Sequence, residues 1–110
     1  MGLDYQLHRV GVDIAKGYRQ VQKAGAAFAK GDTNSGVGHL DKAWIDFDAA
    51  VKHAAKAEED AYNKAGQEID KGNAELKKSI EAYSDGRDER AASHYDSATE
   101  HFDRALGLID

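Results

Sequence analysis

The chain has 110 residues, with 15 lysines and arginines against 20 acidic residues, a net charge of −5, and neither cysteine nor proline. The length suits one domain with a single core, and the lack of cysteine excludes disulfides and thiolate metal sites. No group of basic residues stands clear of acidic neighbours, and no apolar run approaches the ~20 residues of a membrane-spanning helix. Neither nucleic acid nor a membrane span is therefore expected.

The first predicted helix follows from a regular apolar pattern near the start of the chain. Its inner positions advance by alternating threes and fours, and they are Leu3, Leu7, Val10, Ile14, Gly17, Val21, Ala24 and Phe28. Lys30 followed by Gly31 predicts its end, because glycine adopts the left-handed conformation that stops helices. In the loop that follows, Thr33, Asn34 or Ser35 is expected to cap the second helix.

Three further helices are predicted in the same way. The inner face of the second is Val37, Leu40, Trp44, Phe47, Val51 and Ala54. The third stops at Gly86 and presents Tyr62, Ala65, Ile69, Gly72, Leu76, Ser79 or Ile80, and Tyr83. The last, which Asp88 and Glu89 open, is expected to bury Ala92, Tyr95, Thr99, Phe102, Leu106 and Ile109.

The two halves of the chain resemble each other. Residues 1–55 and 56–110 align without a gap and share 13 identities, so HLDKAWIDFDAAV at residues 39–51 returns as HYDSATEHFDRAL at residues 94–106. Each half is predicted to form a helical hairpin. The sequence therefore predicts one all-α domain over residues 1–110, a four-helix up-down-up-down bundle made of two duplicated hairpins with a period of 55 residues.

The join between the halves leaves an alternative open. No glycine or proline lies between Gly38 and Gly66, so the chain could stay helical across the join, with a shift of apolar phase near Ala55 and Glu58. Such a helix would span about 48 residues, or ~72 Å, and its exposed apolar stripes would require a homodimer. The monomer that folds back on itself is the expected form.

Histidines and aspartates form two series with a spacing of seven. His39, Asp46 and His53 make one series, and His94 and His101 make the other. Imidazole and carboxylate groups suit copper, nickel and zinc, but seven residues of helix separate side chains by ~10.5 Å, too far for one ion. We expect a solvated outer stripe, with weak metal binding assisted by another helix or molecule as the alternative.

Other repeated residues have a structural interpretation. Ala43 and Ala50 are expected just beside the helix contact, where a small side chain permits close approach. Asp41 and Asp48 are expected at its other edge, within reach of a lysine or arginine of the adjacent helix.

A family resemblance supports the metal alternative. The glycine-rich turn followed by GHLD, the VKHAAKA stretch and the HYDSATEHFDRA stretch resemble the bacterial small metal-binding proteins, over roughly residues 36–57 and 86–105. Members of that family are short periplasmic four-helix proteins with histidine-rich repeats, proposed to scavenge or buffer copper and other divalent metals. The resemblance implies a periplasmic location, in place of the cytoplasmic one expected otherwise, and copper, nickel or zinc at His39, Asp46, His53, His94 and His101.

Catalytic motifs do not accompany the helical pattern. The chain has neither HExxH nor GxSxG, and no acidic residue stands three positions before a histidine, so we expect no enzyme. The expected function is an interaction or scaffold module that acts through its helical surface or by self-association. The alternatives are weak transition-metal binding or buffering, and a small-ligand site near the glycines inside the helices, which close helix packing would otherwise explain: Gly11, Gly17, Gly66 and Gly72.

Overall fold

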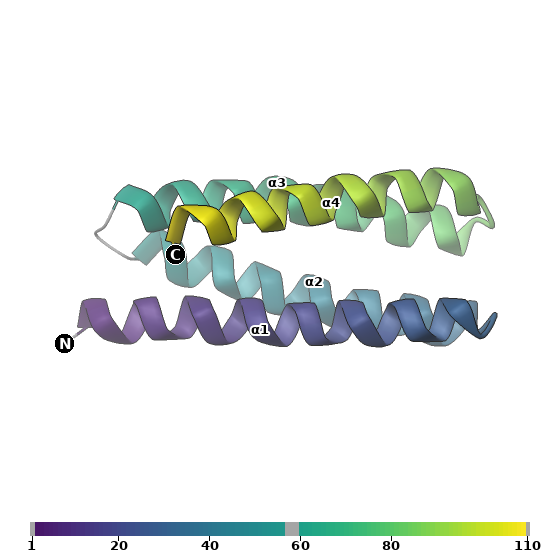
Figure 1. Ribbon diagram of the computed structural model, residues 1–110, viewed down its shortest axis with the longest axis horizontal. Coiled ribbons are helices and arrows are strands. Elements are labelled where there is room, and N and C mark those ends of the chain that lie inside the picture. The colour runs from purple at the N-terminus through teal and green to yellow at the C-terminus, as the bar shows by residue number, and fades with distance from the viewer. Residues whose placement is uncertain (1, 57–59, 110) are drawn as a thin grey trace.

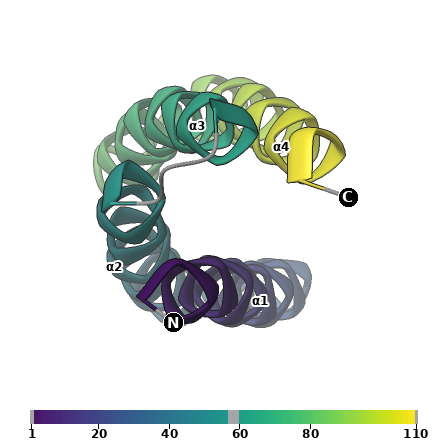
Figure 2. The ribbon, with the colours of Figure 1, turned by 90° about the vertical axis from the view of Figure 1, so that its left-hand side faces the viewer.

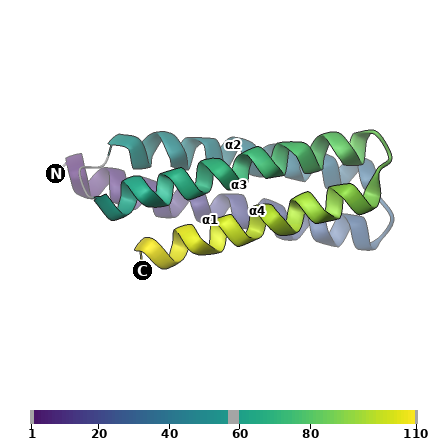
Figure 3. The same ribbon diagram turned by 90° about the horizontal axis from the view of Figure 1, so that it is seen from above.

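The computed structural model describes residues 2–56 and 60–109, and over these ranges it contains four α-helices: α1 (Gly2–Ala29), α2 (Thr33–Lys56), α3 (Asp60–Ser84) and α4 (Asp88–Ile109). Side chains are described from residue 8 onward within the same ranges. Consecutive helices run in opposite directions, and the α3–α4 hairpin lies on the α1–α2 hairpin (Figures 1 and 3). The molecule measures 45 × 18 × 18 Å. The predicted all-α four-helix bundle is thus confirmed.

Both hairpin turns are made by the predicted stop glycines. Gly31 has a φ of 81° and Gly86 a φ of 77°, in the left-handed region that favours glycine. The amide of the next residue then donates to a carbonyl five residues back, as Asp32 does to Ala27 at 2.9 Å. This bond satisfies a carbonyl that the end of the helix would otherwise leave unpaired.

The cap of α2 differs from the expectation. Asp32 caps the helix, because its Oδ1 accepts the amide N–H of Ser35 at 3.1 Å, whereas Thr33, Asn34 or Ser35 was the predicted cap. An aspartate carboxylate at this place satisfies one of the free amides of the first turn and faces the positive end of the helix dipole.

Two phenylalanines one repeat apart form the centre of the core. Phe47 and Phe102 are fully buried, and their rings stack with centroids 3.8 Å apart. Gly17 on α1 lies against the first ring and Gly72 on α3 against the second, and a Cβ at either glycine would stand 2.7 Å from ring carbon. Glycine is therefore needed at both places for the helix backbone to approach an aromatic ring.

The ring contacts also relate the two hairpins. Phe47 stacks on the residue 55 positions later, and so does Phe28, whose ring lies 4.3 Å from that of Tyr83. Residues that touch their own counterparts lie on a two-fold axis. The symmetry holds only at these rings, because α2 packs on α3 whereas the equivalent contact of α4 with α1 is much smaller in the described residues.

On α1 and α3 the buried faces largely agree with the prediction. Val10, Ile14, Gly17, Val21 and Ala24 are buried on α1, and Ala65, Ile69, Gly72 and Leu76 on α3. Of the two options near the end of α3, Ser79 is buried and Ile80 is half-buried. The rings of Phe28, Tyr62 and Tyr83 are half-buried, and Leu3 and Leu7 lie outside the described side chains.

On α2 and α4 the buried face is rotated from the predicted one, toward the side that carries the histidines. Leu40, Phe47 and Ala54 of the predicted α2 face are buried, and so are Ala43 and Ala50, which were predicted to lie beside the contact. The other predicted residues, Val37, Trp44 and Val51, are half-buried. The buried residues of α4 are Ala91, Ala98, Phe102 and Ala105, while Ala92 is exposed and Tyr95, Thr99, Leu106 and Ile109 are half-buried. The prediction weighted large apolar residues, but close helix approach places the small alanines at the centre of the contact.

The helices on either side of the join are separate. The first ends at Lys56, the second begins at Asp60, and they lie side by side in opposite directions (Figures 1 and 3). Hydrogen bonds between Trp44 and Asn73 connect them. The alternative of one helix running through the join is therefore wrong, and Glu58, near which the phase shift was expected, lies outside the described residues.

Seen along its long axis, the bundle follows an arc from α1 to α4 (Figure 2). Tyr18 connects the two ends of this arc, because its ring stands edge-on to Phe47 and Phe102 and its hydroxyl donates to Asp103 at 3.0 Å. Burial, and then the nearby Asp103 carboxylate, raise the pKa of Tyr18. In the described ranges, no helix is long and apolar enough to cross a membrane.

Candidate functional site

The four candidate histidines each bind a side chain on the neighbouring helix of their own hairpin. Through Nδ1 they reach Gln20 from His39 at 2.9 Å, Asp13 from His53 at 2.7 Å, Glu75 from His94 at 2.6 Å and Glu68 from His101 at 2.9 Å. Because amide and carboxylate oxygens accept hydrogen bonds, each imidazole donates through Nδ1, and Nε2 is the ring nitrogen that takes no part in these four bonds. The expected solvated stripe is thus wrong: the rotated faces of α2 and α4 bring these histidines, all half-buried, to the edge of the helix contact.

Asp46, the remaining candidate ligand, is half-buried on α2. Burial raises the pKa of its carboxyl, Lys16 on α1 lowers it, and the negative charge of Asp13 raises it again. The group therefore faces the same stretch of α1 as His53 does, although no hydrogen bond joins Asp46 to His53 in the described structure.

These residues do not come together as a chelating site. Within the described residues, no three side chains of His, Asp or Glu gather where they could hold a metal ion. Each of the four candidate histidines instead pairs with a different residue of α1 or α3. Binding of copper, nickel or zinc stays a prediction, and it would rest on single imidazoles that offer Nε2 one at a time.

Two other expectations about polar and small residues can be compared with the structure. Asp48 pairs with Lys52 of its own helix at 3.1 Å, so the expected ion pair to the adjacent helix is wrong for this residue. The space beside Gly17 and Gly72 is filled by the two stacked rings of the core, which leaves no room for a ligand at these glycines. Close packing is therefore the reason for glycine at both positions.

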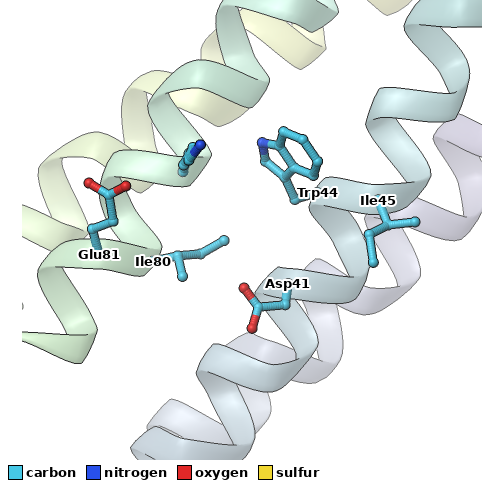
Figure 4. A pocket seen from close by; sticks show the side chains of 6 residues that line it. Asp41, Trp44, Ile45, Ile80 and Glu81 are labelled. Atoms are coloured by element: carbon cyan, nitrogen blue, oxygen red, sulfur yellow. The ribbon is translucent and has the colours of Figure 1, made fainter.

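A groove between α2 and α3 is the better candidate for a binding site. It has a volume of about 350 Å³, and Figure 4 shows its lining, which we call the α2–α3 groove: Asp41, Trp44, Ile45, Lys77, Ile80 and Glu81. The side chain of Ile45 is 63% exposed, one of the large apolar side chains that the described structure leaves in solvent. Three large apolar side chains, Trp44, Ile45 and Ile80, thus line one open cavity.

Two hydrogen bonds fix Trp44, one of the residues that line this groove, against α3. The indole Nε1 of Trp44 donates to the backbone carbonyl of Asn73 at 3.1 Å, and the side-chain amide of Asn73 donates to the carbonyl of Trp44 at 3.1 Å. Asn73 is 3% exposed, and its Oδ1 is buried without a hydrogen-bond partner among the described residues. The reciprocal pair sets the register of α2 against α3 and the orientation of the indole ring.

The other half of the chain does not repeat the groove. At the positions 55 residues away, Trp44 corresponds to Thr99, Ile45 to Glu100, and Ile80 to Gly25. Trp44 and Ile80 pack against the core where α2 meets α3, a contact that α4 and α1 do not match in the described residues, whereas Ile45 is 63% exposed and is not explained by packing. The apolar lining therefore marks a property of one side of the bundle alone.

Sequence reasoning missed this site in part. It placed Trp44 in the core and Asp41 at a helix edge, and it assigned no role to Ile45, Lys77 or Glu81. The available signal was Ile45, a large apolar residue that lies outside the predicted inner face of its helix and is a glutamate in the other half. What the sequence could not show is that α2 and α3 place these residues around one cavity.

Comparison of the chain with models of protein families, with curated proteins and with solved structures finds no match.

Proposed function

We propose that this protein is a non-catalytic interaction module, and that it binds a segment of another protein in the α2–α3 groove. The observation that carries this proposal is the exposed Ile45, 63% accessible, beside Trp44 and Ile80 at one open cavity. Covering the exposed part of this side chain contributes on the order of 1–2 kcal/mol to binding, about two thirds of the value for full burial. An apolar side chain of the partner, inserted between the two helices, would provide that cover.

The groove is also pre-formed, which supports binding of a defined partner. Trp44 is held by its hydrogen bond to the Asn73 carbonyl, and the Asn73 amide holds α3 against α2 in return. A rigid aromatic side chain loses little conformational entropy when a partner covers it.

The lining favours binding over turnover. Its polar groups are two carboxylates and one ammonium, and it offers no serine, cysteine or histidine to act as nucleophile or as an imidazole base. We therefore propose a recognition role without a chemical step.

Selection from a library of displayed helical peptides tests this proposal. Peptides are selected on the wild-type protein and then passed over Ile45→Glu, which introduces the residue that the second half carries as Glu100 and should therefore fold. Glu100→Gln, on the side without the groove, is the matched control. The proposal expects peptides that bind wild type and Glu100→Gln and lose at least tenfold in affinity for Ile45→Glu. Recovery only of peptides that bind all three proteins equally would refute it.

A further inference from the structure

The charges around the α2–α3 groove describe the partner more closely, on the assumption that the groove is the binding surface proposed above. We infer that its occupant is a basic amphipathic helix of another protein, with lysine or arginine about one turn to either side of the apolar side chain that enters the groove. The groove runs between two antiparallel helices, and a third helix fits such a groove through anchors one turn apart.

Carboxylates stand on both walls of the groove. Asp41 is on α2 and Glu81 on α3, and Figure 4 shows Asp41 and Ile80 reaching into the space between the helices. Both acidic side chains are exposed, and in the described part of the chain neither forms an ion pair. Two separated carboxylates can therefore each receive a cation from the partner without breaking an existing pair.

A single cation of the protein opposes them. Lys77 lines the same groove, is exposed, and is not within ion-pairing distance of either carboxylate in the described structure. Two carboxylates against one ammonium leave the lining negative. Because the lysine side chain is flexible and hydrated, it can turn away when a basic partner binds.

The ring of Trp44 and a comparison with the other half of the chain also favour a basic partner. The aromatic face of Trp44 is attractive to a cation wherever the partner leaves it open. In the other half, Asp41 returns as Asp96, but Glu81 corresponds to Ala26 and Lys77 to Gln22, so the pair of carboxylates, like the apolar lining, occurs in this groove and is not repeated.

A second copy of the chain is the less suitable occupant. Each copy carries a net charge of −5 and would bring the same acidic groove to the contact. Like charges that face each other weaken association. A basic partner gains from the same charges, both in its rate of encounter and in its contacts at the rim.

Two synthetic helical peptides test the inference. Both carry the same leucine anchor, with lysine at the positions four residues before and after it in one peptide and glutamate in the other. Affinity for the wild-type protein is measured by fluorescence anisotropy at 0.05 M and 0.5 M salt. We expect the lysine peptide to bind about tenfold tighter at low salt, and the preference to shrink at high salt, because salt screens exposed charges.

Protein variants assign the preference to the named residues. Asp41→Asn combined with Glu81→Gln should abolish the preference for lysine, whereas Lys77→Met should increase it about twofold. Glu100→Gln, on the side without the groove, should leave it unchanged. The charge inference is overturned if both peptides bind equally, or if the preference survives the double change, and the proposed function then stands provided that binding is still lost in Ile45→Glu.

Two other results would overturn the proposed function or the identity of the occupant. If no peptide selected from the library depends on Ile45, the proposed function itself fails. If the wild-type protein sediments as a dimer and Ile45→Glu as a monomer, the occupant is a second copy of the chain and the basic helix is refuted.

Discussion

Replacing Gly17 by alanine is expected to destabilise the protein although alanine is the better helix former. A Cβ at this position would stand 2.7 Å from the ring of Phe47. That ring cannot easily retreat, because it is fully buried and stacks on Phe102 at 3.8 Å. Overpacking of a core costs about 1–3 kcal/mol, and the gain in helix propensity offsets about 1 kcal/mol of it. We expect a net loss of about 1 kcal/mol in the free energy of unfolding.

Gly11 on the same helix provides the matched control, since nothing lies within 4 Å of a Cβ built there. Gly11→Ala should gain about 0.5–1 kcal/mol from helix propensity alone, which separates the two variants by roughly 2 kcal/mol. Gly72→Ala should lose more than Gly17→Ala, because its Cβ would also meet the Ala98 carbonyl at 3.0 Å, and backbone cannot move aside as a side chain can.

Urea unfolding followed by far-ultraviolet circular dichroism measures these differences. The slope with denaturant should be unchanged, so that a shift in midpoint reports stability. If Gly17→Ala is as stable as Gly11→Ala, the ring does not confine this position and the packing argument for the repeated glycine is wrong.

Three further changes address the polar groups. Burial raises the pKa of Asp46, so the ionised carboxylate lowers the stability of the folded protein once the pH rises through its folded pKa. Asp46→Asn should therefore raise the melting temperature at pH 7 and have little effect near pH 3. The hydrogen bond from His101 is the main cause that lowers the pKa of Glu68. The stability that this bond adds to the folded protein is present above the unfolded pKa of about 4.3 and is lost as the pH falls through the lower folded pKa. Glu68→Gln should therefore lower the melting temperature at pH 6 and differ little from wild type at pH 3, and an equal loss at both values would contradict the assignment. Asn73→Leu should change the free energy of unfolding by less than about 1 kcal/mol, because it removes both a hydrogen bond and a buried unpaired oxygen; chemical denaturation would show a larger loss if the amide were essential to the register.

The candidate sites differ in how far the sequence could predict them. The residue types and the seven-residue spacing of the histidines were visible, and so was the argument against one ion on one helix. Their partners were not, because His53 pairs with Asp13 across 40 positions of the chain. The α2–α3 groove was less visible still, because Ile45 and Ile80 become neighbours only when α2 and α3 pack in register.

By itself, the sequence determined the number and approximate ends of the helices, the stop glycines at residues 31 and 86, and the buried faces of α1 and α3, since these depend on local conformation and on one clear apolar stripe. The tertiary structure decided the rotation of α2 and α4. Their sequences allow two adjacent faces to be buried, one rich in large residues and one centred on alanines. Close approach of the helices around the stacked rings of Phe47 and Phe102 favours the alanine face. That choice turns the histidines toward the carboxylates of α1 and α3 and leaves Trp44 and Ile45 at the groove.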